Sequence, residues 1–141
     1  MAYRHPGMIE RLEDKLGISE SEAEELFDDT KRFLYLCATV EGPLAPSERI
    51  DEAWHHFILH TKDYDAFCRR YFGRFIHHVP HNRAERSKKD ASGFCRMRSA
   101  ALAAFGQPLS SNWGGTLLSA EGSNCKNTEP CQNGCEDCAP D

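Results

Sequence analysis

Histidines gather in the middle of this chain of 141 residues, where six of the seven lie between positions 55 and 81. His56 and His60 stand four residues apart, a spacing that makes side chains neighbours on one face of a helix. Two imidazoles at that spacing suit one metal ion, as in many helical zinc sites. Asp51 and His55 have the same spacing on another edge of the segment, where a carboxylate either shares a metal ion or orients the imidazole.

A metal pocket also needs a second wall, and the His77–His78 pair is the obvious source because Gly73 lets the chain turn back. Cys68 lies on the segment between the two histidine groups. The central site that we expect consists of Asp51, His55, Cys68 and His78. The secondary candidates are His56, His60 and His77. Zn²⁺ tolerates this mixture of hard and soft ligands, and Fe²⁺ tolerates it less well if the thiolate takes part.

The same histidines also have a structural interpretation. Histidines on amphipathic helices often cap carbonyls, pack against aromatic rings or face water. The neighbouring aromatic residues are typical of a core rather than of a ligand cage: Trp54, Phe57, Tyr64, Phe67, Tyr71, Phe72 and Phe75. From the residues alone, a metal site and a structural cluster both stay open.

Four cysteines form a second candidate site near the C-terminus: Cys125, Cys131, Cys135 and Cys138. Four thiols within 14 residues can wrap one Zn²⁺, because closing so short a loop costs little entropy and the metal supplies the missing core. Disulfides or free thiols are the alternative. The last three also have the spacing of a radical-SAM cluster loop, which we reject because the chain lacks the strands of that barrel. Cys37 and Cys95 lie among apolar neighbours and are interpreted as small core residues.

Helical periodicity accounts for the elements that would position these side chains. We expect helices over about 8–16, 20–41, 48–60, 64–71 and 92–105. Ser19 and Glu22 have the spacing of a capping box, and Ser47 is the next N-cap. Residues 81–91 are polar and are interpreted as a loop. The sequence therefore predicts an all-α fold, a small bundle of four to five helices, with no alternation long enough for a sheet.

The net charge of −5 is unevenly distributed. Residues 1–30 carry −6, residues 31–119 carry +5 and residues 120–141 carry −4. The basic middle is interrupted by acidic residues, so nucleic-acid binding is not favoured. No apolar run suits a membrane span or a signal peptide, so we expect a cytoplasmic protein. Composition divides the chain into a helical domain over 1–118 and an acidic, Cys-rich tail over 119–141, disordered unless it is linked by metal.

One ordered string of motifs suggests a family. It contains Ile50-Asp51-Glu52-Ala53-Trp54-His55, Phe57-Ile58-Leu59-His60-Thr61, Tyr64, Phe67-Cys68 and Phe72-Gly73-Arg74-Phe75-Ile76-His77-His78-Val79-Pro80. The string resembles the glycine-rich domain-containing protein-like family, and it covers about residues 47–81, with a weaker echo from Ala104 through Trp113. The resemblance implies an α-helical fold and favours as motif positions Asp51, Trp54, His55, Tyr64, Cys68, Gly73 and His78. The glycine-rich region of larger relatives is replaced here by the short Cys-rich tail.

Three classes of function stay open. The first, which we favour, is a metal-binding helical protein that holds Zn²⁺ or Fe²⁺. The second is a non-catalytic interaction module with a structural histidine cluster, whose acidic ends engage a basic protein partner. The third is a precursor in which a helical leader is cut after Gly115 from a Cys-rich peptide. No nucleophile motif, phosphate-binding glycine loop or spaced carboxylate pair stands out, so the sequence does not identify an enzyme.

Overall fold

The computed structural model describes residues 2–79 and 83–114, with the backbone alone described over 83–91. Within these residues the chain forms five α-helices and one 3₁₀ turn, and no strand. The elements are α1 (Pro6–Leu16), α2 (Glu20–Thr39), α3 (Glu48–Ile58), α4 (Thr61–Phe72), α5 (Arg83–Phe105) and η1 (Ser111–Trp113). The all-α prediction is confirmed.

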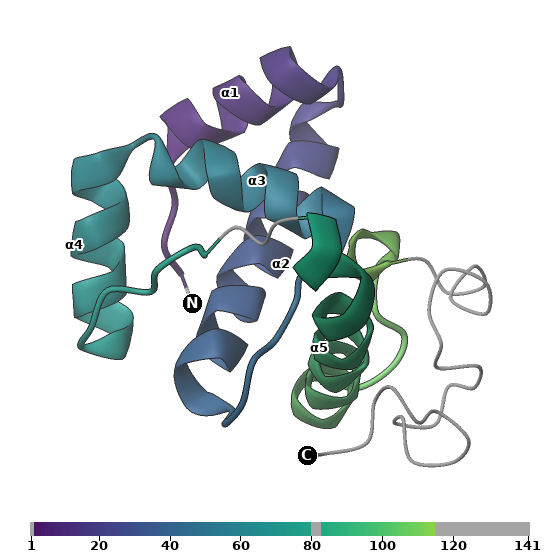
Figure 1. Cartoon of the computed structure of the whole chain (residues 1–141). Coiled ribbons are helices and arrows are strands. Elements are labelled where there is room, and N and C mark those ends of the chain that lie inside the picture. Colours follow the sequence, from purple (N-terminus) through teal and green to yellow (C-terminus); the bar gives the residue numbers. More distant parts are fainter. Residues whose placement is uncertain (1, 80–82, 115–141) are drawn as a thin grey trace.

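The long helix α2 runs through the middle of the molecule (Figure 1). Helices α1 and α3 both pack on α2 and on each other, while α4 packs against α3 and α5 against α2. In Figure 1, α4 and α5 lie toward opposite sides of the molecule. The core between these elements is rich in aromatic rings, among them Phe27, Phe33, Phe57, Tyr64, Phe67 and Trp113. Helix α3 is thus held by α1, α2 and α4, which makes it a rigid support for the residues on its exposed face.

Local sequence explains where the first helices begin and end. Gly17 ends α1 with φ of 65° and Gly73 ends α4 with φ of 73°, a left-handed conformation that glycine adopts without strain. Ser19 and Glu22 form the predicted capping box at the start of α2. Ser47 caps α3 by accepting a hydrogen bond from the backbone N–H of Ile50. These predicted boundaries are confirmed.

Several predicted boundaries are wrong. Helix α1 begins at Pro6 rather than at about residue 8, α3 ends at Ile58 rather than at about residue 60, and α4 begins at Thr61 rather than at residue 64. Residues 83–91, interpreted as part of a polar loop, belong to α5, which begins at Arg83. The stretch is polar, but it contains alanine, glutamate, lysine and arginine, all good helix formers, and neither glycine nor proline. Helix α2 ends at Thr39, two residues before the expected end.

The predicted domain boundary and the predicted tail cannot be compared with the structure, whereas the helices can be searched for a membrane span. The boundary at residue 118 and the tail over 119–141 lie beyond the described part of the chain. Among the helices that the structure describes, none combines the length and the apolar character needed to cross a bilayer.

Candidate metal centre

Asp51, His55 and His78 meet on one side of α3. Asp51 and His55 lie one turn apart on that helix, and His78 comes from the segment that follows α4. His78 Nε2 donates a hydrogen bond of 2.7 Å to Asp51 Oδ1, and His55 Nδ1 lies 3.6 Å from Asp51 Oδ2. The two imidazole centroids are 4.3 Å apart. The two histidine segments therefore fold back to face each other, as the sequence predicted.

A buried hydrogen-bond chain holds the segment that carries His78. Trp54 Nε1 donates to the hydroxyl of Tyr64 at 2.9 Å, and that hydroxyl donates to the carbonyl of Ile76 at 2.6 Å. Burial raises the pKa of Tyr64, so the phenol keeps the proton that it donates. The ring of His78 then packs against Trp54 at a centroid distance of 4.3 Å. Sequence reasoning treated Trp54 and Tyr64 as core residues and missed this chain, although the polar end of a buried Tyr or Trp usually has a partner.

The three side chains differ in their exposure to solvent. The side chain of His78 is 14% exposed, that of Asp51 is 37% exposed and that of His55 is 54% exposed. The cluster therefore has an inner side formed by Trp54 and His78 and an outer side at His55. Two imidazole nitrogens and a carboxylate oxygen are ligands that zinc and iron(II) both accept.

Cys68, the fourth residue of the predicted central site, does not join the cluster. It is fully buried on α4, where it contacts the hydroxyl of Tyr64 and the backbone of Ile76. Burial raises the pKa of this thiol. The group whose ligand atoms all lie within 4.8 Å of one another consists of Asp51, His55 and His78. The expectation that Cys68 shares their pocket is therefore wrong, because its thiol lies against the hydroxyl of Tyr64 and the backbone of Ile76 instead.

The secondary histidines make other contacts. His56 Nδ1 accepts a hydrogen bond of 3.0 Å from Arg11 Nε. His60 Nδ1 donates to the carbonyl of His56 at 3.1 Å, and its ring packs against His5 at 4.7 Å. The exposed ring of His77 packs against Phe75. The spacing of His56 and His60 was therefore misleading, since their ring nitrogens engage different partners.

The remaining cysteines divide between core and tail. Cys95 is fully buried, and Cys37 packs against the core. Burial raises the pKa of Cys37 to about 12, so its thiol stays protonated at neutral pH. Cys125, Cys131, Cys135 and Cys138 lie outside the described residues.

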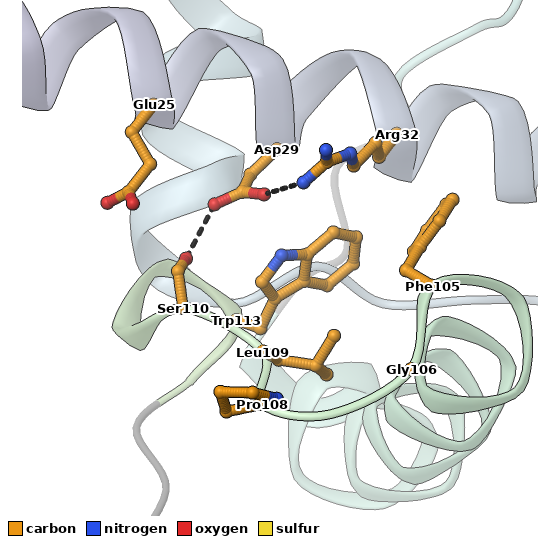
Figure 2. A pocket seen from close by; sticks show the side chains of 9 residues that line it. All are labelled: Glu25, Asp29, Arg32, Phe105, Gly106, Pro108, Leu109, Ser110 and Trp113. Carbon is orange, nitrogen blue, oxygen red and sulfur yellow. Dashed lines mark hydrogen bonds and ion pairs between the residues drawn. The ribbon is translucent and has the colours of Figure 1, made fainter.

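A separate hollow of about 460 Å³ opens between α2 and the chain that follows α5 (Figure 2). Asp29 is buried beside it and accepts hydrogen bonds from Ser110 Oγ, Asn112 Nδ2 and Arg32 Nη1. The guanidinium of Arg32 also lies over the ring of Phe105. A second hollow, of about 520 Å³, lies between the N-terminal segment, α1 and α2. Neither hollow is lined by the Asp51 cluster, so we place the candidate site on the surface of α3 rather than in a cavity.

Fold and cluster together define a small all-α protein with two histidines and one carboxylate gathered on its surface. A family model described as UCP032817-like matches residues 2–104, so the chain belongs to that family. Its description names no activity. The comparison with curated proteins gave no match, and neither did the comparison with solved structures.

The predicted membership of the glycine-rich domain-containing protein-like family is wrong. The matching family is UCP032817-like, and nothing in the comparisons indicates the other family. The motif string covers only about a third of the chain, and much of it consists of aromatic and histidine residues at ordinary helical spacing. The roles of Asp51, His55 and His78 therefore rest on their geometry in this structure.

Proposed function

We propose that this protein binds one divalent transition-metal ion, zinc or iron(II), through Asp51, His55 and His78. The observation that carries the proposal is the convergence of one ligand atom from each residue to within 4.8 Å of the others. The ligands come from two parts of the chain, so an ion between them would link α3 to the segment that follows α4.

The spacing of the ligand atoms supports the proposal. Ligands about 2.0–2.1 Å from a tetrahedral ion are about 3.3 Å from one another. The distance from Asp51 to His78 is 2.7 Å and that from Asp51 to His55 is 3.6 Å. The two distances run to different oxygens of the Asp51 carboxylate, so the side chains must rotate for one of these oxygens and the two imidazole nitrogens to surround an ion. The proton between His78 and Asp51 would leave as the ion binds.

Both metals fit a ligand set without sulfur. Zn²⁺ accepts two imidazoles and a carboxylate, and the same set is the facial triad of many iron(II) proteins. The sequence disfavoured Fe²⁺ only if the thiolate of Cys68 took part in binding. Cys68 is not one of these ligands, so that reason no longer applies. The tail cysteines remain a predicted second zinc site.

One observation favours a second candidate function, the interaction module. The hydrogen bond between His78 and Asp51 satisfies both groups without an ion. In that case the cluster only stabilises the fold, by joining His78 to α3, and the acidic ends of the chain bind a basic protein partner.

Metal titration of the purified full chain tests the proposal. A background variant with serine at positions 125, 131, 135 and 138 removes the tail cysteines as ligands, so that the measured stoichiometry excludes a site formed by them. After chelation and desalting, zinc is titrated by calorimetry, and iron(II) is titrated under anaerobic conditions. We expect one ion per chain, with affinity reduced by at least about 10-fold in His78→Ala and in Asp51→Asn.

His77→Ala is the matched control, because it removes the neighbouring imidazole and leaves the cluster intact. Equal affinity in the background variant and in His78→Ala would contradict the proposal. Absence of binding in both the unmodified chain and the background variant would favour the interaction module. Metal that disappears only when the tail thiols are replaced would place the site in the tail.

A further inference from the structure

We infer that an ion bound to Asp51, His55 and His78 keeps at least one coordination position for an external oxygen-donor anion, such as a carboxylate or a hydroxamate. This inference rests on the proposed metal binding and goes beyond it. It distinguishes a site that acts on a small ligand from one that only stabilises the fold.

The number of ligands is the first argument. Zinc in structural sites has four protein ligands, and an octahedral iron(II) ion has six. The described side chains supply three. Cys68 is buried at Tyr64, while His56 is engaged by Arg11. The ligands that the described side chains supply therefore leave the coordination sphere of either metal incomplete.

Exposure shows where the open position lies. His78 is packed against Trp54, whereas His55 is 54% exposed and Asp51 is 37% exposed. An ion between these residues has protein on the side of Trp54 and solvent on the side of His55. A small ligand can reach that side without any movement of the helices.

Charge indicates the chemical class of the ligand. A divalent ion with one carboxylate and two neutral imidazoles has a net charge of +1, which favours an anion over a neutral or cationic ligand. Oxygen donors suit both zinc and iron(II). Water occupies the position when no such anion is present.

Cobalt(II) provides the test, because its visible absorption reports the coordination number and the identity of the ligands. Cobalt(II) is bound to the full chain with serine in place of the four tail cysteines, and acetohydroxamate is then titrated. We expect a saturable change in the cobalt bands at one anion per ion. The cobalt should elute with the protein after desalting, and His77→Ala should behave like the background variant.

His81 lies outside the described residues, only three positions after His78 in sequence, so His81→Ala is included in the test. Absorption bands that respond to the anion only in His81→Ala would show that His81 fills the open coordination position, which would overturn the inference. Bands that do not respond in either protein, or cobalt lost to the anion, would also overturn it, while cobalt binding itself would support the proposed function. Failure of cobalt to bind would overturn the proposed function, and the inference with it.

Discussion

At the scale of single residues, the hydroxyl of Tyr64 joins two parts of the chain. It accepts a hydrogen bond from Trp54 on α3 and donates one to Ile76 in the segment that carries His78. All three residues are buried. The hydroxyl of Tyr64 therefore helps to hold the segment that places His78 against Asp51.

Tyr64→Phe should lower the free energy of unfolding by about 1–3 kcal/mol, because it leaves the indole N–H of Trp54 and the carbonyl of Ile76 without this partner. Urea unfolding followed by circular dichroism measures the change. Tyr35→Phe is the control, since Tyr35 is 43% exposed, and it should change stability by less than about 0.5 kcal/mol. Equal stability of Tyr64→Phe and the unmodified chain would show that the hydrogen-bond chain contributes nothing.

His56 should make the stability depend on pH. Burial, and next to it the charge of Arg11, lower the pKa of His56 in the folded chain. The unfolded chain therefore binds a proton more readily, so the contribution is fully present above about pH 6.5 and is lost as the pH falls through the lowered pKa. His56→Asn removes the titrating group and keeps an acceptor for Arg11.

Urea unfolding at about pH 7.5 and pH 5 would measure this effect. The unmodified chain should lose more stability on acidification than His56→Asn does. Groups common to both proteins cancel in the comparison. The same loss in both proteins would mean that His56 titrates in the folded chain as it does in the unfolded chain.

At the scale of elements, α3 is the helix that positions the cluster, and its first turn is tied to a distant part of the chain. The hydroxyl of Ser47 accepts from the backbone N–H of Ile50 and donates to the carbonyl of Asn112 in η1. Asn112 in turn donates to the buried Asp29 on α2. The start of α3 is thus fixed to both α2 and η1.

Ser47→Ala should lower the free energy of unfolding by about 2–3 kcal/mol, because it removes an N-cap and also leaves the buried carbonyl of Asn112 without this donor. Ser19→Ala is the matched control. It removes the N-cap of α2 at an exposed position and should lower the free energy of unfolding by about 1 kcal/mol. Chemical denaturation of the two variants measures the difference. Equal costs would show that the contact with η1 adds no stability.

The helices that could be predicted from sequence are those with clear end signals. Ser19, Glu22 and Ser47 marked starts, while Gly17 and Gly73 marked ends, and the structure has each of them. The start of α5 could not be predicted from hydrophobic periodicity, because residues 83–91 contain too few apolar side chains to show one. Helix propensity was the better indicator there.

At the scale of the whole molecule, the candidate site joins residues 51 and 78, and the distance between them is set by tertiary packing. The sequence predicted that Asp51, His55 and His78 meet, because both segments carried ligand residues and Gly73 allowed a turn. It did not separate Cys68 from them, since helical spacing does not show that the hydroxyl of Tyr64 lies against the thiol. It overvalued His56 and His60, because their spacing does not reveal Arg11 and His5 on neighbouring parts of the chain.

A bound ion should stabilise the whole fold, since its ligands come from α3 and from the segment between α4 and α5. A ligand at about 100-fold above its Kd raises the free energy of unfolding by about 2.7 kcal/mol, which corresponds to a rise in Tm of roughly 10 °C in a chain of this size. Differential scanning fluorimetry with zinc measures this shift in the variant that has serine at the four tail positions. Asp51→Asn should lose the shift, and His77→Ala should keep it. Hydrogen exchange should slow most in residues 74–79 and in α3. Slower exchange in α1 alone would mean that zinc binds elsewhere, because α1 supplies none of the three ligands.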